Sequence, residues 1–147
     1  MNAKTRKTRE NSCGWLVKVM GLRMDAAMKV ELEEHELDLK SFSNLMCLFE
    51  QDELTQVELG QRVGNPQYAT SRVVDALEQR KLVRRRPDPT SRRAHRIVLT
   101  AKGESLRKVL PAIVQRVNNK MLAGLEGSER KNLVSLLQKA LGVNTKK

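Results

Sequence analysis

Cysteine, aromatic residues and long apolar runs are all scarce in this sequence of 147 residues. Two cysteines are too few for a disulfide framework, and they lack the CxxC spacing of a zinc site. Aromatic residues make up 3%, which argues against a protein that stacks single-stranded bases on aromatic platforms. No apolar run approaches the ~20 residues that cross a membrane, and no signal-peptide segment follows the basic N-terminus. We therefore expect a reduced, cytoplasmic protein without membrane contact.

Groups that carry catalysis or bind metals are also missing. His35 and His95 stand at no ligand spacing from Cys, Asp or Glu, so we expect no metal site. The sequence contains no Ser/His/Asp set, no paired carboxylates and no phosphate-binding loop. We therefore expect no catalytic residues, no cofactor and no enzymatic activity.

Positive charge is what the sequence has in excess, since 28 Lys and Arg against 17 Asp and Glu give a net charge of +11. On so short a chain this indicates an anionic partner, with nucleic acid favoured over an acidic membrane. The main group of cations lies between Arg80 and Arg96, opposed only by Asp88, and it flanks two prolines. A second group, within residues 1–11, is expected to be a disordered basic arm that either contacts phosphates or is simply solvated.

The spacing of apolar residues predicts amphipathic helices over residues 12–35 and 41–52. Thr55-Gln-Val-Glu58 has the pattern of a capping box, and Gly64 is suited to end the helix that begins there. Asn65 is predicted to cap the next helix, with Pro66 at its first position. Two short helices joined by a few residues that include glycine are typical of a helix-turn-helix motif.

A β-hairpin is predicted after this motif, with strands at residues 82–86 and 95–99 and a loop at 87–94. A hairpin in this place is the wing of a winged helix-turn-helix. Thr100 is predicted to cap the next helix.

Two further helices complete the prediction. The apolar stripe from Leu106 to Leu122 predicts a long helix, which Pro111 should kink because it lacks a backbone donor. Ser128 is predicted to cap the last helix, and Gly142 to end it.

The segment from Thr55 to Leu106 resembles the MarR family of bacterial winged-helix transcription regulators. The residues that carry the resemblance are Leu59 with Gly64, the run Ser71-Arg-Val-Val-Asp-Ala-Leu-Glu78, Leu82-Val83, and the wing and strand from Arg85 to Gly103, which end in Leu-Thr-x-x-Gly. Ser91 departs from the family pattern, which often has Asp there. Lys40 stands where the family usually has a small hydroxyl residue.

The resemblance implies a homodimer in which the first and last helices of two subunits pack together. The apolar stripe from Leu106 to Leu125 agrees, because at 1.5 Å per residue it spans ~30 Å and needs a partner surface. The fold class we expect is mostly α: a winged helix-turn-helix with a two-stranded β wing and terminal dimerisation helices. Its parts are a basic disordered arm at 1–11, an N-terminal dimerisation helix at 12–35, a DNA-binding region at 36–100 and C-terminal dimerisation helices at 101–144.

We interpret the sequence as a sequence-specific regulator of transcription that binds double-stranded DNA. In this interpretation it is a repressor, binds an inverted-repeat operator as a homodimer, and is released by a small-molecule effector. Two alternatives stay open: an architectural DNA-binding protein without a ligand response, and a thiol-based redox-sensing regulator.

Candidate DNA contacts follow from the outward face of the second helix of the motif. Arg72 can donate two hydrogen bonds to guanine, and Gln67, Thr70 and Ser71 are further polar candidates. By the resemblance, Arg93 on the wing enters a minor groove, while Arg92 contacts a phosphate. Asp75 is interpreted as orienting a wing arginine.

The remaining candidates concern phosphates, an effector and redox chemistry. Thr55 and Gln56 at a helix N-terminus, together with Arg86, are candidate phosphate contacts. A pocket for a small anionic aromatic effector is expected near the residues Trp15, Arg23 and Met24. Cys13 is the candidate redox cysteine, since nearby cations could lower the pKa of its thiol.

Overall fold

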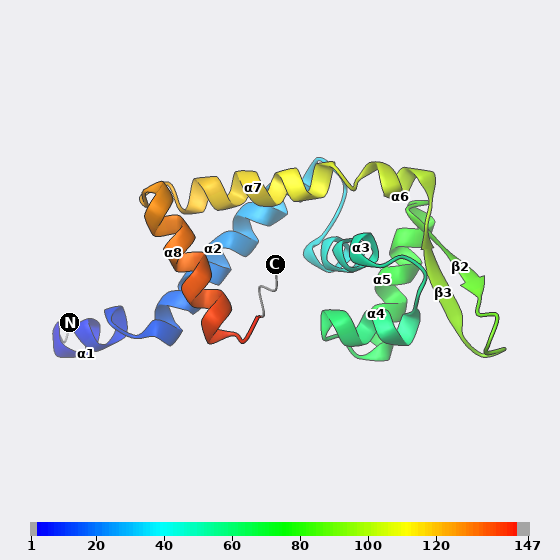
Figure 1. Cartoon of the computed structure of the whole chain (residues 1–147), viewed down its shortest axis with the longest axis horizontal. Coiled ribbons are helices and arrows are strands. Elements are labelled where there is room, and N and C mark those ends of the chain that lie inside the picture. The colour runs from blue at the N-terminus through cyan, green and yellow to red at the C-terminus, as the bar shows by residue number, and fades with distance from the viewer. Residues whose placement is uncertain (1–2, 144–147) are drawn as a thin grey trace.

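The computed structural model describes residues 3–143, which form an elongated molecule with two ends (Figure 1). A helical end holds α1 (Ala3–Glu10), α2 (Cys13–Glu33) and α8 (Gly127–Ala140). A winged end holds the other elements apart from α7 (Val109–Met121), which runs along one edge of the molecule between the two ends. The elements of the winged end are α3 (Leu39–Glu50), β1 (Leu54–Thr55), α4 (Gln56–Val63), α5 (Gln67–Gln79), β2 (Val83–Pro87), β3 (His95–Leu99) and α6 (Ala101–Ser105).

The winged helix-turn-helix that the sequence predicts is present. Helix α4 starts at the predicted capping box, in which the Glu58 amide donates to Thr55 Oγ1 at 3.2 Å and the Thr55 amide donates to Glu58 Oε2 at 2.8 Å. These bonds satisfy amides that a helix start leaves without intrahelical partners. The helix ends at Gly64, whose φ of +68° is the left-handed conformation that glycine adopts without strain.

The start of α5 differs by one residue from the prediction. Pro66, not Asn65, is the N-cap, with extended backbone at φ −64° and ψ 156°. Three donors converge on the Pro66 carbonyl: the amides of Ala69 and Thr70, at 3.0 and 3.1 Å, and the Thr70 hydroxyl at 3.2 Å. The first backbone amide bonds of the helix therefore end on Pro66, and the N-cap makes no side-chain hydrogen bond.

The predicted two-stranded wing is present as β2 and β3, and a further strand, β1, extends it to an antiparallel sheet of order β1-β3-β2. The added strand β1 pairs Leu54 with Ile97 and Thr55 with Arg96. Two residues are too short for the alternating pattern by which a strand is recognised in a sequence. Strand β2 runs on to Pro87, which pairs with His95 at the end of an edge strand, where a missing amide is tolerated.

The predicted kink at Pro111 is absent, and the helix is instead interrupted before Pro111. Thr100 caps α6 as predicted, but α6 ends at Ser105 and α7 starts at Val109. Pro111 therefore lies in the first turn of α7, where a missing backbone donor costs nothing.

The cap of the last helix also differs from the prediction. Its N-cap is Glu126, not Ser128, because the Glu129 carboxylate reaches back and accepts from the Glu126 amide at 2.8 Å. The left-handed Gly142, at φ +66°, follows the helix end as predicted.

The expectation of a disordered arm at residues 1–11 is wrong for the residues that the structure describes, since Ala3–Glu10 form α1. An isolated helix of this length is marginal in water, and two contacts stabilise it here. Arg6 pairs with Glu10 at 2.8 Å, and the Arg9 guanidinium lies 5.0 Å from the centre of the Trp15 ring. Residues 1, 2 and 144, which belong to the predicted parts, lie outside the described residues.

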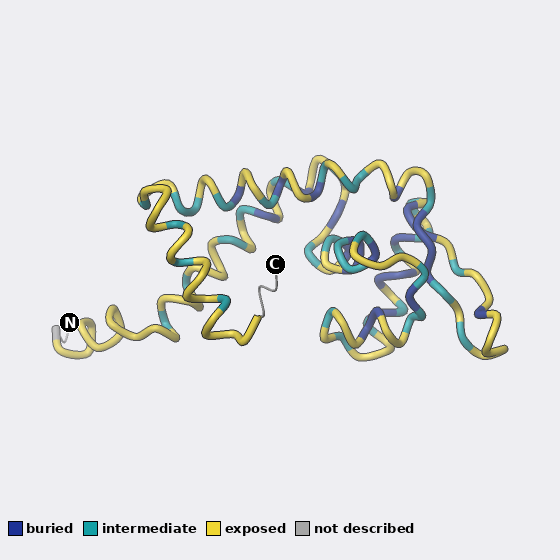
Figure 2. Tube along the Cα trace, in the orientation of Figure 1, coloured by how far each residue is buried: buried dark blue, intermediate teal, exposed yellow. Residues whose placement is uncertain are grey.

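The core lies in the winged end and where α2 crosses α7 (Figure 2). Leu45, Leu59, Leu77 and Ile97 are fully buried between α3, α4, α5 and the sheet. Leu32 from α2 and Leu110 and Ile113 from α7 extend this core toward the helical end, whereas α8 buries no residue. No helix in residues 3–143 is long and apolar enough to cross a membrane.

Candidate nucleic-acid interface

Helices α4 and α5 pack closely because Gly60 has no side chain. A Cβ at Gly60 would lie 2.7 Å from Thr70 Oγ1 and 3.2 Å from the Asn65 carbonyl oxygen. Thr70 is completely buried in this contact and donates its hydroxyl hydrogen to Pro66. The prediction that Thr70 faces DNA is therefore wrong: helical spacing put it near the edge of the outward face, and the packing of α4 covers it.

The outward face of α5 carries the other predicted residues. Gln67 and Arg72 are exposed, and Ser71 is half-buried. Arg72 has no hydrogen bond or ion pair with any residue in 3–143, so its guanidinium is available to a ligand. Tyr68, 70% exposed, belongs to the same face. Sequence analysis gave Tyr68 no role, although an exposed tyrosine among polar side chains on this helix is itself a signal of an interface.

Arg85 on β2 joins α5 to the wing. Its guanidinium donates to Asp75 Oδ1 and to Glu78 Oε2, both at 2.6 Å, and its backbone amide donates to Glu78 Oε1 at 2.8 Å. The contact of Asp75 with a wing arginine is thus present, and Glu78 is a partner that sequence analysis missed. Gln56, a predicted phosphate contact, is 3.3 Å from the same guanidinium through Oε1. This cluster sets the angle between α5 and the wing.

A second ion pair holds the base of the wing loop. Asp88 is buried and pairs with Arg96 at 2.7 Å. Hydrogen bonds from the hydroxyl and amide of Thr90, at 2.5 and 2.7 Å, hold the pKa of the Asp88 carboxyl below its usual value. Arg92 and Arg93, between these anchors, are exposed and have no ion pair or hydrogen bond within the described part of the chain. The loop therefore presents two free guanidinium groups on a fixed base.

Two of the predicted phosphate contacts are already engaged. Arg86 pairs with Glu53 at 2.6 Å. Thr55 shares its hydroxyl between the Glu58 amide and Glu58 Oε2, which leaves its side chain committed to the capping box. For either to contact a phosphate, the present partner must be exchanged or shared. Arg84, exposed on β2 between Val83 and Arg85, has no such commitment.

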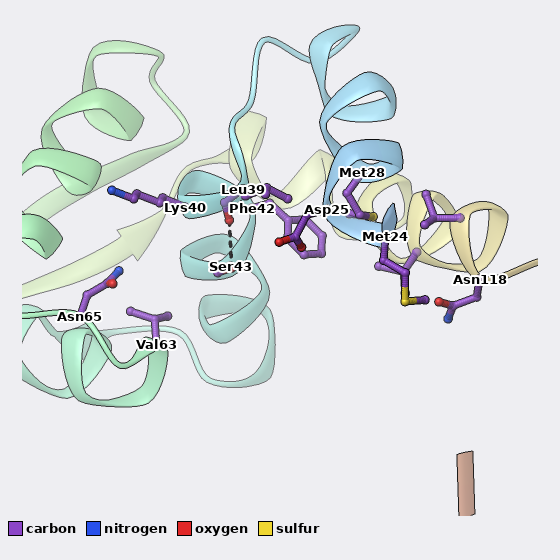
Figure 3. Close-up of a pocket in the computed structure, with 12 residues that line it drawn as sticks. Met24, Asp25, Met28, Leu39, Lys40, Phe42, Ser43, Val63, Asn65 and Asn118 are labelled. Atoms are coloured by element: carbon purple, nitrogen blue, oxygen red, sulfur yellow. Dashed lines mark hydrogen bonds between the residues drawn. The ribbon is translucent and has the colours of Figure 1, made fainter. Parts of the chain in front are cut away.

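A cavity of about 490 Å³ lies between α2, α3 and α7, beside the end of α4 (Figure 3). Met24, Met28, Phe42 and Val114 form much of its apolar lining, and Lys40 belongs to its rim. Within the lining, the Ser43 hydroxyl donates a hydrogen bond to the Leu39 carbonyl at 2.9 Å (Figure 3).

Of the three residues predicted for an effector pocket, only Met24 lines this cavity. Trp15 does not line it, because nine residues at 100° each place Trp15 on the opposite side of α2 from Met24, about 13 Å away along the helix. Trp15 lies against α1 instead. Arg23 is exposed and is not among the lining residues.

The two cysteines occupy different surroundings. Cys13 is exposed at the first position of α2, and Cys47 is half-buried in α3. Burial raises the pKa of the Cys47 thiol, which makes it less reactive. Across residues 3–143, no group of three or more His, Cys, Asp or Glu side chains is placed to hold a metal ion.

Comparison with known proteins identifies this arrangement. Residues 37–95 match the model of the MarR family. The chain contains a MarR-family domain. This match confirms the resemblance seen in the sequence. The matched residues run from the turn after α2, through the helix-turn-helix, to the start of β3.

Solved structures of MarR-family proteins share the fold over most of the chain. The apo form of wild-type MarR from E. coli matches with a TM-score of 0.80 at 24% identity, covering 88% of this chain and 97% of that one. The Mycobacterium tuberculosis MarR family protein Rv2887, solved in complex with DNA, gives 0.77 at 24% identity, with 88% and 97% covered. BpsR of Bordetella bronchiseptica, whose DNA binding is regulated by 6-hydroxynicotinic acid, gives 0.76 at 25% identity, with 86% and 96% covered. The MarR fold thus extends beyond the matched domain to the helical end.

Proposed function

We propose that this protein is a homodimeric transcription regulator that reads a specific sequence in double-stranded DNA. The observation that carries the proposal is that α5 and the wing each present exposed arginines with no hydrogen bond or ion pair within residues 3–143. These are Arg72 on α5, and Arg92 with Arg93 on the wing. The Arg85 cluster fixes these surfaces relative to each other. A helix for the major groove and a loop for the adjacent minor groove divide the reading of bases between them.

Individual roles follow from exposure and free donors. Arg72 reads guanine with two hydrogen bonds, and Gln67 and Ser71 add polar contacts beside it. Arg93 enters a narrow minor groove, where the negative potential is strongest, and Arg92 binds a phosphate. Gln56, Thr55 and Arg86 bind phosphates at the rim after exchanging or sharing their present partners.

The exposed apolar side chains of the helical end support the dimer. On α2, Leu16, Val17 and Val30 are 49, 52 and 67% exposed, and on α8 Leu136 is 56% exposed. Exposed large apolar side chains on two helices of one end support a protein contact there. A two-fold dimer buries the same surface on both chains, and it presents two α5 helices to an inverted repeat.

The cavity beside α2 and α7 is the proposed effector site. Its apolar wall of Met24, Met28 and Phe42 suits an aromatic ring, and the Lys40 ammonium suits an anionic substituent. BpsR, whose DNA binding responds to 6-hydroxynicotinic acid, supports a ligand of this class. Because the cavity lies between the dimer helices and the winged end, a bound ligand would change the spacing of the two α5 helices. In this proposal the protein is a repressor, and the ligand releases it from DNA.

The test is a footprint on the DNA that flanks the protein's own gene, followed by titration of the protected site. Arg72→Ala and Arg93→Ala should each weaken binding to it by about 1–3 kcal/mol, with the first relaxing the preference for one base pair. Unchanged titrations for both variants would contradict the proposed docking. For the effector, calorimetry with phenolic and pyridine carboxylic acids should give binding heat that Lys40→Ala reduces. If none of these acids gives binding heat or reduces DNA binding, the proposed effector site is wrong, while the proposed DNA binding stands.

A further inference from the structure

A second cavity, of about 320 Å³, lies where the chain enters and leaves the winged end. Two stretches of chain lead out of that end: residues 34–38 connect α3 to α2, and residues 106–108 connect α6 to α7 (Figure 1). Glu34 and Glu36 from the first stretch and Leu106 from the second line the cavity. It shares no lining residue with the cavity beside Met24, so a ligand bound here would occupy a separate site.

The wall of this cavity carries charges of both signs. Glu34 and Glu36 are acidic, whereas Arg80 at the C-cap of α5 and Lys102 in α6 are basic. Within residues 3–143 none of these four side chains forms an ion pair, although all four line one cavity. The Lys102 ammonium donates to the Arg80 carbonyl oxygen at 3.0 Å and keeps two further hydrogens. The cavity therefore offers free carboxylates and free donors together.

The Arg80 guanidinium is the donor that most needs a partner. Arg80 is half-buried, and its Nη1 is buried without a hydrogen-bond partner in the described part of the chain. A buried donor without an acceptor costs free energy. A carboxylate matches the guanidinium fork, because its two oxygens accept two parallel hydrogen bonds. Since neither acid of the lining pairs with Arg80, a carboxylate supplied by a ligand would fill this role.

The mixed charge of the wall favours a ligand that itself carries both signs. A dianion bound to the two basic side chains would lie beside the two acids of the same cavity, and like charges brought together in this way repel. A dication would meet the same repulsion from the basic side chains. A zwitterion gives all four charged side chains a partner of opposite sign. Part of the remaining wall is apolar, since Leu82 is buried and Leu106 half-buried.

We propose that this cavity binds a small zwitterion of the class of the apolar α-amino acids. The ligand carboxylate accepts hydrogen bonds from Arg80 and Lys102, and its ammonium donates to Glu34 and Glu36. The ligand side chain rests against the two leucines of the wall. A volume of about 320 Å³ lies at the lower end of the range of sites for small ligands, ~300–1,000 Å³.

A ligand in this cavity would also act on the DNA-reading helix. Held by Arg80 and Glu34, it ties the C-terminal end of α5 to the stretch that leads to α2. It therefore favours one orientation of α5 relative to α2. We expect DNA and the amino acid to change each other's affinity, because linkage between two sites is reciprocal. Binding of the amino acid is independent of the proposed function, and only this coupling rests on it.

The first test is calorimetry of the full chain without DNA. The probes are L-valine, L-leucine and L-methionine, each compared with its N-acetyl derivative, which lacks the ammonium, and its amide, which lacks the carboxylate. We expect at least one of the three amino acids to bind. Its two derivatives should bind at least about tenfold more weakly, because each has lost charge-assisted hydrogen bonds. Succinate, which carries only negative charge, should not bind.

Two variants with neighbouring controls locate the site. Arg80→Gln removes the proposed carboxylate partner, and Lys81→Gln removes the same charge from the next residue, which is exposed and does not line the cavity. Glu34→Gln removes an ammonium partner, and Glu33→Gln is its control for the same reason. We expect Arg80→Gln and Glu34→Gln to bind the amino acid about tenfold more weakly and both controls to bind it like the parent. Circular dichroism verifies folding, and if Arg80→Gln is unfolded, Glu34→Gln and the derivatives decide the question.

The inference would be overturned if none of the three amino acids gave heat, if the derivatives bound as tightly as the amino acid, or if the lining variants bound like their controls. Binding of succinate in place of the amino acids would overturn it in favour of a simple anion site. The coupling is tested by titrating the operator with and without saturating amino acid, where we expect a change in DNA affinity of at least about fivefold. An unchanged DNA affinity beside confirmed binding would overturn the coupling and leave the site. Failure of the parent to bind DNA would instead overturn the proposed function.

Discussion

Arg85 is the residue on which the geometry of the reading surface depends most. Replacing Arg85 by Ala leaves its backbone amide bonded to Glu78 but removes the guanidinium that joins Asp75, Glu78 and Gln56. Two carboxylates on α5, the proposed reading helix, then lie close together without a cation. We expect a loss of stability and a loosened angle between α5 and the wing.

The expected loss of stability depends on how far the side chains of the cluster are exposed to solvent. The Arg85 side chain is 22% exposed, whereas those of Asp75 and Glu78 are 56 and 37% exposed. Breaking a buried pair costs about 3–5 kcal/mol, and exposed pairs contribute about 0–1 kcal/mol each. Since both carboxylates keep contact with water, we expect a loss of about 1–2 kcal/mol, which lowers the melting temperature by about 3–8 °C.

Thermal melting measures this loss, and it is run at a fixed protein concentration because the proposed dimerisation would make the melting temperature depend on concentration. The matched control is Arg84→Ala, which removes the same charge from the neighbouring, exposed position of β2. We expect Arg84→Ala to melt within about 1–2 °C of the parent, as an exposed substitution should. If the two variants melt together, Arg85 does not hold the wing to α5.

Three further predictions test the packing of Gly103, the capping box of α4 and the burial of Thr70. Gly103→Ala places a Cβ 2.0 Å from the Leu82 carbonyl oxygen and should destabilise the protein by about 3 kcal/mol. The control, Gly124→Ala, has nothing within 4 Å of its Cβ and should be nearly neutral. Equal melting temperatures for the two variants would contradict the packing of α6 on the wing. The hydrogen bond from the Thr55 amide holds the pKa of Glu58 below its usual 4.5, so this carboxylate stabilises the fold above pH 4.5 and loses its effect as the pH falls further. Glu58→Gln should therefore reduce the stability gained between pH 3 and 6 in urea titrations, and an unchanged pH profile would show that the capping box contributes nothing. Thr70→Val should bind the operator like the parent because Thr70 is buried, and a loss comparable to that of Arg72→Ala would place Thr70 on the DNA.

The elements that could be predicted from the sequence are those with a local chemical signature. The capping box at Thr55 and Glu58, the left-handed Gly64 and the strand at residues 95–99 are all formed as their residue types require. The contact of Asp75 with a wing arginine could be anticipated because an acid among DNA-facing cations needs a partner. Each of these depends on residues close in the chain or on one dominant physical effect.

The features that could not be predicted depend on contacts between distant parts of the chain. Burial of Thr70 results from its contact with Gly60, and the strand at Leu54 forms only because Ile97 is beside it. Trp15 and Met24 lie on opposite sides of one helix, and only the packing of that helix against α3 and α7 decides which side lines the cavity.

The central claim is that two α5 helices, related by a two-fold axis, read one inverted repeat. The most direct measurement is the affinity of the intact protein for its operator before and after insertion of about 5 bp between the half-sites, which turns one half-site to the opposite face of the duplex. The parent should sediment as a dimer and lose at least tenfold in affinity, about 1.4 kcal/mol, on the altered site. A monomer, or a dimer that binds both sites equally well, would contradict it.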